Sequence, residues 1–413
     1  MTTAGQLPQM PGFGQKNGSN FFKEENKMQF TKSTWRKSLV VGTAVCLSYL
    51  SFNMADTGVA SAVAAGKTYN GTVYVAGHGG HFAKADVTLD SNAATPVTIN
   101  SLDKIDIGDT TTHMTHDARI DANDRNIMYW STYKLDPQGK QHVGKSDLKT
   151  GKVIIDIAMD PDPRATGGEK KMPLYCASGQ SKKFYMPVFM GAEAYVDVLD
   201  KVTLEKKHRV FVSDLGYAKG SYQFLHGINS PDNKSFLLAL NLTKEGKGTG
   251  DIDFVLVDMA ALEDGKFKEI KRNTLKGAPG KTITFREYFS NDGKLIYQSA
   301  GDRLWVIDAA TLQLVDEKML PEGLQVHDAM PTPDGKVALL TVRNLEDACD
   351  SDGKPIVKNG EKSQITDGSF MLYDAAAKKL NNKTISTCFA CHKDAGLGDK
   401  NAVLCGLDAN WKN

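Results

Sequence analysis

The chain has 413 residues, of which 41% are hydrophobic and 24% charged, and its formal net charge at pH 7 is +1. This is an ordinary globular composition. Neither the charge balance nor any run of Lys and Arg provides the basic patch that a nucleic-acid partner requires. The 38 glycines indicate many tight turns.

Residues 1–65 have the pattern of a leader that is removed from the mature chain. Basic residues precede a short apolar run at 39–52, and the small residues of "GVASAVAAGK" follow it. These are the marks of a secretory signal peptide, at about 28–64. The apolar run is too short to span a bilayer comfortably, although an uncleaved membrane anchor is the alternative. The sequence predicts a periplasmic or extracellular protein with no stable membrane span after cleavage.

Residues 66–375 are predicted to form an all-β domain. Short segments such as "GTVYVAG", "GKVIIDIAM" and "RLWVIDA" are rich in Val, Ile, Leu and aromatic residues and are bounded by turn residues. The stretches 226–241, 285–315 and 327–344 share one plan, in which a strand runs into an Asp-Gly or Asp-Asn turn, a Lys and an apolar strand. The stretch 116–133 is a looser copy.

Self-similarity at this period, with four strands per unit, is typical of a β-propeller rather than of a sandwich or barrel. About 310 residues at about 44 per blade predict a seven-bladed β-propeller. The repeats, notably "QFLHGINSPDNKSFLLALN", resemble the YVTN type of propeller repeat. That class includes the haem d1 domain of cytochrome cd1 nitrite reductases and the large subunit of methylamine dehydrogenase. The resemblance implies a fold and not a particular chemistry.

A c-type haem signal stands in the last part of the chain, 376–413, where we see no blade pattern. In "STCFACHKDAG", Cys388 and Cys391 have the spacing that joins both vinyl groups of a porphyrin, and His392 is placed as the proximal iron ligand. A thioredoxin-like redox pair or a zinc site would fit this context less well, because a suitable helix and a second ligand pair are missing. Secretion, which covalent haem attachment requires, is predicted independently by the leader.

Little chain follows the motif, so we expect the haem to lie partly against the propeller or a partner subunit. No Met follows His392, and a sixth iron ligand would therefore come from the propeller or from another chain. Once two cysteines hold the haem, three remain in the mature chain: Cys176, Cys349 and Cys405. One disulfide among them is possible in an oxidising compartment, and the sequence does not assign its partners.

Histidines are predicted to gather at one mouth of the central channel. Six are candidates for a second metal or cofactor: His78, His81, His113, His116, His226 and His327. His116, His226 and His327 precede the repeated turn and therefore lie near the start of three inner strands. The hairpin "GHGGH" follows the second strand of a blade, where the chain has returned to the same face of the propeller. Arg119 and Arg286 are expected nearby. His142 and His208 are predicted to lie in charged turns, exposed and without a role.

Imidazoles from several blades that meet on an axis resemble the architecture of nitrous oxide reductase and of copper-dependent thiocyanate dehydrogenase. That resemblance implies copper at the mouth, and the likeness to propellers in which channel-facing histidines hold haem d1 implies a second haem as the alternative, since imidazole binds copper, iron and zinc well. The chain departs from that pattern, because His-Gly-Gly-His replaces a paired His-His and no electron-entry copper motif is visible. In the simpler alternative, each histidine only forms a hydrogen bond to a neighbouring blade.

The function that we expect is electron transfer by an exported mono-haem c-type cytochrome, as or within a periplasmic oxidoreductase. A small-molecule substrate would react at the histidine-rich mouth, with His116, His226 and His327 as catalytic groups. The haem would exchange electrons with a redox partner protein or partner subunit. The alternatives are a non-catalytic docking or binding subunit of a larger redox complex, and a propeller in which the Cys-x-x-Cys-His run is incidental. The sequence does not decide whether the protein is an enzyme.

Overall fold

The computed structural model describes residues 67–76, 79–166, 175–191, 193–344, 357–358, 361–362, 367–386 and 405–412. The chain divides into two units between Ala65 and Gly66, and the predicted leader lies outside the described residues. So do His78, Cys349 and the predicted haem ligands, Cys388, Cys391 and His392. No helix in the described part of the chain has the length and hydrophobicity needed to cross a membrane.

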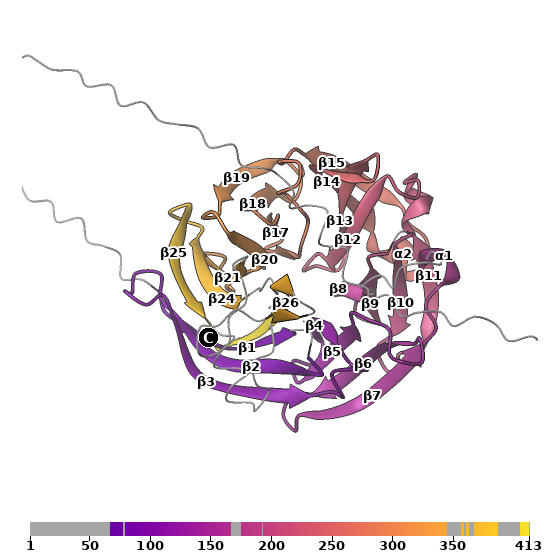
Figure 1. Ribbon diagram of the computed structural model, residues 1–413, viewed down its shortest axis with the longest axis horizontal. Helices are drawn as coiled ribbons and strands as arrows, with labels where there is room; N and C mark the ends of the chain where they lie inside the picture. The colour runs from indigo at the N-terminus through magenta and orange to yellow at the C-terminus, as the bar shows by residue number, and fades with distance from the viewer. Residues whose placement is uncertain are drawn as a thin grey trace, which may run out of the picture. The chain divides into compact units, whose positions relative to one another are not determined.

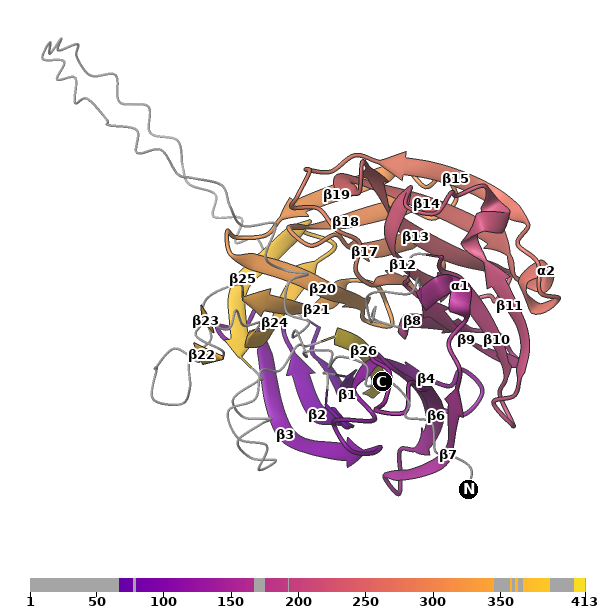
Figure 2. The same cartoon turned by 45° about the vertical axis from the view of Figure 1, so that its right-hand side comes forward.

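The described residues form six four-stranded antiparallel sheets, the blades of a β-propeller (Figures 1 and 2). From the axis outward, blade one contains β26 (Cys405–Lys412), β1 (Tyr69–Ala76), β2 (His81–Leu89) and β3 (Val97–Asp106). Blade two contains β4 (Thr115–Ile120), β5 (Ile127–Thr132), β6 (Gln141–Asp147) and β7 (Lys152–Met159). Blade three contains β8 (Tyr175–Gln180), β9 (Phe184–Phe189), β10 (Tyr195–Asp200) and β11 (Lys206–Phe211).

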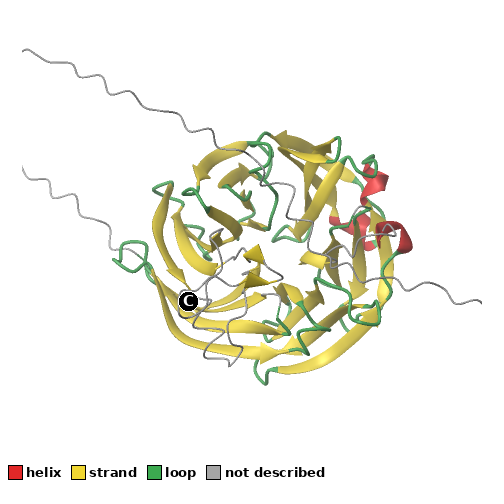
Figure 3. Ribbon diagram, viewed as in Figure 1, coloured by secondary structure: helices red, strands yellow, loops and turns green. Residues whose placement is uncertain are grey.

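Blade four contains β12 (Tyr222–Asn229), β13 (Ser235–Lys244), β14 (Lys247–Asp258) and β15 (Glu269–Leu275). Blade five contains β16 (Glu287–Phe289), β17 (Leu295–Ser299), β18 (Arg303–Asp308) and β19 (Leu314–Met319). Blade six contains β20 (Leu324–Pro331), β21 (Val337–Asn344), β24 (Asp367–Asp374) and β25 (Lys379–Ser386). Short elements complete the described fold (Figure 3): α1 (Pro163–Thr166), η1 (Val212–Leu215), α2 (Met259–Glu263), β22 (Val357–Lys358) and β23 (Glu361–Lys362).

The prediction of seven blades is therefore wrong, although the prediction of an all-β propeller is confirmed. The sequence estimate assumed about 44 residues per blade, and the real blades are longer. In blade four, β13 and β14 have 10 and 12 residues. In blade six, the small hairpin of β22 and β23 is inserted between β21 and β24.

The repeated Asp-Gly or Asp-Asn turn has a local cause, because a Ser or Thr stands two residues before its Asp. After β16, the Ser290 hydroxyl donates to the Asp292 carboxylate at 2.7 Å, and the amide of Leu295 donates back to Ser290 Oγ at 3.0 Å. After β20, Thr332 and Asp334 form the same pair at 3.1 Å. These side chains satisfy the backbone groups of a tight turn, which is why the pattern recurs between the first two strands of a blade.

The core consists of six apolar clusters, each formed by two neighbouring blades. One cluster joins Val87 and Leu407 of blade one to Phe370 of blade six, so it closes the ring. Leu407 belongs to β26, which pairs with β1 although it comes from the end of the chain. Strands β25 and β26, which the sequence analysis placed in the tail at 376–413, are therefore part of the propeller.

All blades share one polarity. Because adjacent strands are antiparallel, innermost strands begin on the same face on which fourth strands end. We call this the histidine face. The fourth strand β25 ends at Ser386 and the innermost strand β26 begins at Cys405, so both described flanks of the segment 387–404 lie on the histidine face.

Candidate functional site

Six buried side chains, one from each blade, surround the propeller axis towards the histidine face. We call them the axial ring: Cys405, His116, Cys176, His226, Arg286 and His327. None of them is more than 4% exposed. Five belong to innermost strands, and Arg286 directly precedes β16. Figure 1 shows β26, β4, β8, β12 and β20 around the centre of the propeller.

Irregular strand pairing positions most of this ring. His116, Cys176 and His327 are each the residue left unpaired where the register of an innermost strand shifts. Such bulges bend the strand and re-aim a side chain. In blade one the extra residue is Gly406, whose φ is +76° and whose added Cβ would lie 2.7 Å from the carbonyl oxygen of His116. Only glycine meets both conditions, so Cys405 reaches the axis because Gly406 follows it.

A thiol and an imidazole meet within the ring. Cys176 Sγ lies 3.1 Å from His226 Nε2, and both side chains are buried. Burial raises the pKa of the Cys176 thiol and lowers the pKa of His226, which leaves both groups neutral. The other nitrogen of His226, Nδ1, is buried and has no hydrogen-bond partner among the described residues.

His327 presents a second neutral imidazole. Its Nδ1 lies 2.9 Å from Asp328 Oδ2, and Thr341 and Tyr288 also donate to this carboxylate. Burial lowers the pKa of His327 to about 4. Burial opposes the charge of Asp328, but His327 and the cation of Arg286 outweigh it and lower the pKa of Asp328. The Nδ1 proton of His327 therefore points at the carboxylate, and Nε2 keeps its lone pair without a partner in the described structure.

A buried guanidinium completes the polar lining. Arg286 Nη2 donates to Asp117, and Arg286 Nε donates to the carbonyl oxygen of Cys176 at 3.2 Å. Its Nη1 has no partner among the described residues. The adjacent Glu287 is 2% exposed, and neither of its carboxylate oxygens has a partner there. Burial, partly opposed by Arg286, raises the pKa of Glu287 to about 8, so this carboxyl is protonated at neutral pH.

Partly exposed side chains pack against the axial ring. Tyr133 stacks on His116 with ring centroids 4.3 Å apart, and Phe285 lies 4.6 Å from His327. The guanidinium of Arg343 lies 4.8 Å above the Phe285 ring. Tyr133, Phe285 and Arg343 are half-buried, and we call this group the entrance to the axial ring.

The predicted site residues separate into groups. His116, His226 and His327 share the axial ring, and the rings of His116 and His327 are 5.4 Å apart. His81 begins β2, the third strand of blade one, and Arg119 lies beside Asp408 at 3.7 Å. His113 lies in blade two against His142, with ring centroids 4.4 Å apart.

His142 and His208, which were predicted to lie in turns, belong to strands β6 and β11. Of these two, His208 is exposed, as predicted. His142 is only 8% exposed, which contradicts that prediction. Sequence reasoning also missed Cys176 and Cys405 as members of the ring. Aligning the innermost strands, with "YCASGQ" beneath "THDARI", would have placed Cys176 beside the position of His116.

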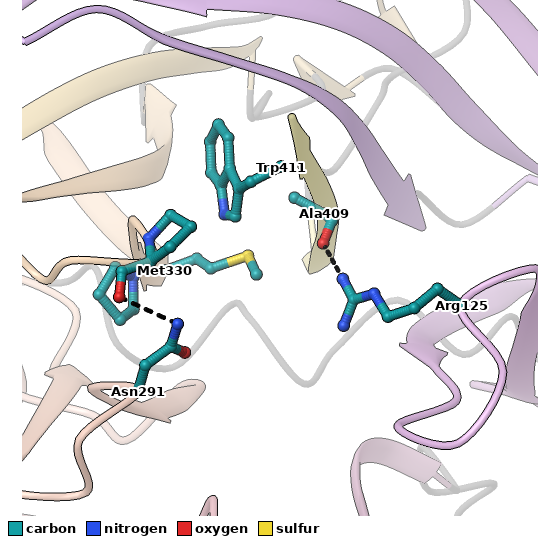
Figure 4. Close-up of a pocket in the computed structure, with 7 residues that line it drawn as sticks. Arg125, Asn291, Met330, Ala409 and Trp411 are labelled. Carbon is teal, nitrogen blue, oxygen red and sulfur yellow. Dashed lines mark hydrogen bonds between the residues drawn. The ribbon is translucent and has the colours of Figure 1, made fainter. Parts of the chain in front are cut away.

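A hollow of about 230 Å³ opens on the face opposite the histidines (Figure 4). Met330 and Trp411, from the far ends of β20 and β26, line it together with Arg125 and Asn291. Arg125 Nη2 donates to the carbonyl oxygen of Ala409 at 2.6 Å. The buried polar atoms of the axial ring are not part of this hollow.

No protein-family model matches the chain, and no curated protein matches it. The likeness to YVTN repeats and to c-type cytochromes therefore stays a prediction. Among solved structures, the chain is similar to the β-propeller domain of Myceliophteria thermophila Cps50 (Swd1), with 13% identity, a TM-score of 0.38, and coverage of 66% of this chain and 85% of that one.

The chain is also similar to a chain of a mitotic checkpoint complex, with 9% identity, a TM-score of 0.42, and coverage of 74% of this chain and 76% of that one. For Kuenenia stuttgartiensis hydrazine synthase the identity is 10%, the TM-score 0.41, and the coverage 75% of this chain and 92% of that one. None of these likenesses bears on what this chain does. What is shown is a six-bladed β-propeller.

Proposed function

We propose that the protein is an exported mono-haem c-type cytochrome that transfers electrons, as or within a periplasmic oxidoreductase. The observation that carries the proposal is the Cys-x-x-Cys-His run at Cys388, Cys391 and His392, in a segment whose two described flanks both lie on the histidine face. The haem, when bound, supplies a one-electron redox centre.

The entrance to the axial ring fits a porphyrin chemically. The half-buried rings of Tyr133 and Phe285 offer apolar surface for a macrocycle, and the guanidinium of Arg343 offers a partner for a propionate. Behind them, Nε2 of His327 is a buried nitrogen lone pair without a partner in the described residues. A haem bound at 388–392 would thus face residues of complementary chemistry.

The axial ring would bind and orient a small polar substrate. His226 Nδ1, His327 Nε2 and Arg286 Nη1 are buried polar atoms without partners in the described structure, and a buried polar atom without a partner costs free energy. A bound ligand with an acceptor group would satisfy Arg286 Nη1, whereas the two imidazole nitrogens could be satisfied by the same ligand or by a metal ion. His327, held by Asp328, and the protonated Glu287 would then accept or supply protons during electron transfer.

The proposal is tested by haem content. The full chain is produced in a strain that exports and matures c-type haem, as wild type, as the double variant Cys388→Ser with Cys391→Ser, and as Cys349→Ser. A pyridine haemochrome assay and a haem stain after denaturing electrophoresis should show one covalent haem per chain in the wild type and in Cys349→Ser, and none in the double variant. Equal haem content in the wild type and the double variant would overturn the proposal.

A second candidate, a non-catalytic docking or binding subunit, is favoured by the hollow beside Trp411 on the opposite face. The double variant His226→Ala with His327→Ala separates the two functions. If it leaves the haem spectrum and the rate of electron exchange with a small redox protein unchanged, and the axial ring of the wild type holds no metal or second haem, the docking function holds. Loss of a second metal, or of substrate-dependent haem reduction, supports the oxidoreductase.

A further inference from the structure

A second cluster of titratable side chains lies in blade two, apart from the axial ring. Two imidazoles form hydrogen bonds with the carboxylate of Asp156, on β7. His113 Nε2 lies 2.9 Å from Asp156 Oδ2, and His142 Nδ1 lies 2.9 Å from Asp156 Oδ1. His113 precedes β4 and His142 is in β6, so three segments of the blade converge here. The cluster lies on the histidine face, because β4 and β6 begin there and β7 ends there.

The three side chains have the geometry of a metal-ligand set. One nitrogen of each histidine and a carboxylate oxygen of Asp156 all lie within 4.8 Å of one another, and no other such group occurs in the described parts of the chain. In a tetrahedral zinc site, with bonds of about 2.0–2.2 Å, ligand atoms are about 3.3 Å apart. A metal ion could therefore replace the protons that now lie between these atoms after small side-chain rotations.

Hydrogen bonds hold the second nitrogen of each imidazole. Thr112 Oγ1 lies 2.7 Å from His113 Nδ1, and Asp136 Oδ2 lies 3.2 Å from His142 Nε2. Asp136 itself accepts from the amides of Gln138 and Lys140, at 2.9 and 2.7 Å. Outer partners of this kind, a carboxylate on a histidine above all, fix the ring orientation and tautomer of metal-binding histidines.

The charges of the cluster also favour a cation. Both nitrogens of His142 face carboxylate oxygens, of Asp156 and Asp136, and in the absence of metal the hydrogen bond from Nδ1 to Asp156 places a proton between these two atoms. A divalent ion that binds at Nδ1 releases that proton to solvent. The two carboxylates then balance the metal charge, with both imidazoles neutral.

We propose that His113 Nε2, His142 Nδ1 and the Asp156 carboxylate bind a divalent transition-metal ion of the zinc type, with a coordination position left open to solvent. The Asp156 side chain is 32% exposed, whereas each imidazole side chain is 11% exposed, so solvent reaches the cluster on the carboxylate side. Three protein ligands and an open position are typical of catalytic rather than structural zinc sites. The proposal does not depend on the haem or on the proposed redox function.

The test uses the full chain, freed of metal with a chelator and titrated with Zn²⁺ in a calorimeter. The wild type should bind one zinc ion per chain at this site. His142→Gln and Asp156→Asn should weaken that binding at least 100-fold, and Asp136→Asn, which keeps all three ligands, about 10- to 100-fold. His208→Gln, which removes an exposed histidine of β11, should bind zinc like the wild type.

Co²⁺ provides a second readout, because its visible spectrum reports ligand geometry independently of turnover. The wild type and His208→Gln should give a tetrahedral or five-coordinate cobalt spectrum that His142→Gln lacks. The proposal is overturned if zinc affinity and stoichiometry are the same in the wild type, Asp156→Asn and Asp136→Asn, because the bound zinc would then lie elsewhere. It is equally overturned if the wild type binds no zinc.

Discussion

Replacing Glu287 by Gln tests the electrostatics of the buried axis. Glu287 is 2% exposed, neither carboxylate oxygen has a partner among the described residues, and burial raises its pKa from 4.5 to about 8. Between these two values the folded chain keeps a proton that the unfolded chain has released. The contribution to stability is therefore fully present below pH 4.5 and is lost as the pH rises through 8.

At about 1.4 kcal/mol per pKa unit, the wild type should lose about 3–4 kcal/mol of unfolding free energy from this group between pH 5 and pH 8. Glu287→Gln, which resembles the protonated acid in shape, should not show this loss. Urea unfolding at pH 5, 6.5 and 8 measures the difference, with Glu322→Gln as an exposed control. If the difference between wild type and Glu287→Gln does not change with pH, Glu287 is ionised in the folded protein and the reasoning fails.

Further predictions concern the closure and the axis of the propeller. Leu407→Ala, at a fully buried position of β26, should lower the unfolding free energy by about 2–5 kcal/mol. The control Val202→Ala, at a position 73% exposed, should change it by less than about 0.5 kcal/mol. Equal effects of the two variants in urea unfolding would contradict ring closure by β26. Gly406→Ala should lower the unfolding free energy by about 1–2 kcal/mol because of its left-handed backbone, and by more because the added Cβ would contact the carbonyl oxygen of His116. Gly139 is also left-handed but has no neighbours within reach of an added Cβ, so Gly139→Ala should lower the unfolding free energy by the backbone contribution only. Asp328→Asn should destabilise the fold by about 3–5 kcal/mol, because Arg286 loses a buried counter-charge. A variant as stable as the wild type in urea unfolding would contradict this network.

The turn pattern made the propeller predictable, but the number of blades was not. Ser290–Asp292 and Thr332–Asp334 leave a local signal because each turn is satisfied by its own side chains. Blade length has no such signal, since insertions such as β22 and β23 are tolerated at a strand end. A further local signal, an aspartate that ends the third strand and caps the following turn, occurs at Asp147 and Asp308, but it was not used to divide the chain into blades.

The candidate site was partly predictable for the same reason. His116, His226 and His327 stand at comparable points of recognisable repeats, so a common mouth follows from topology. The link between His142 and Asp156 depends on the register of β6 against β7, and the entry of Cys405 depends on a strand supplied by the far end of the chain. Neither the exact register of that hairpin nor the partner of a distant strand can be read from a single sequence.

The intact mass and visible spectrum of the exported full chain test the central claim most directly. The account predicts a mature polypeptide that is heavier than its amino acids by one haem, keeps this mass after denaturation and shows a Soret band that shifts on reduction. A polypeptide with only its amino-acid mass and no Soret absorption, purified from a strain that matures other c-type cytochromes, would contradict it.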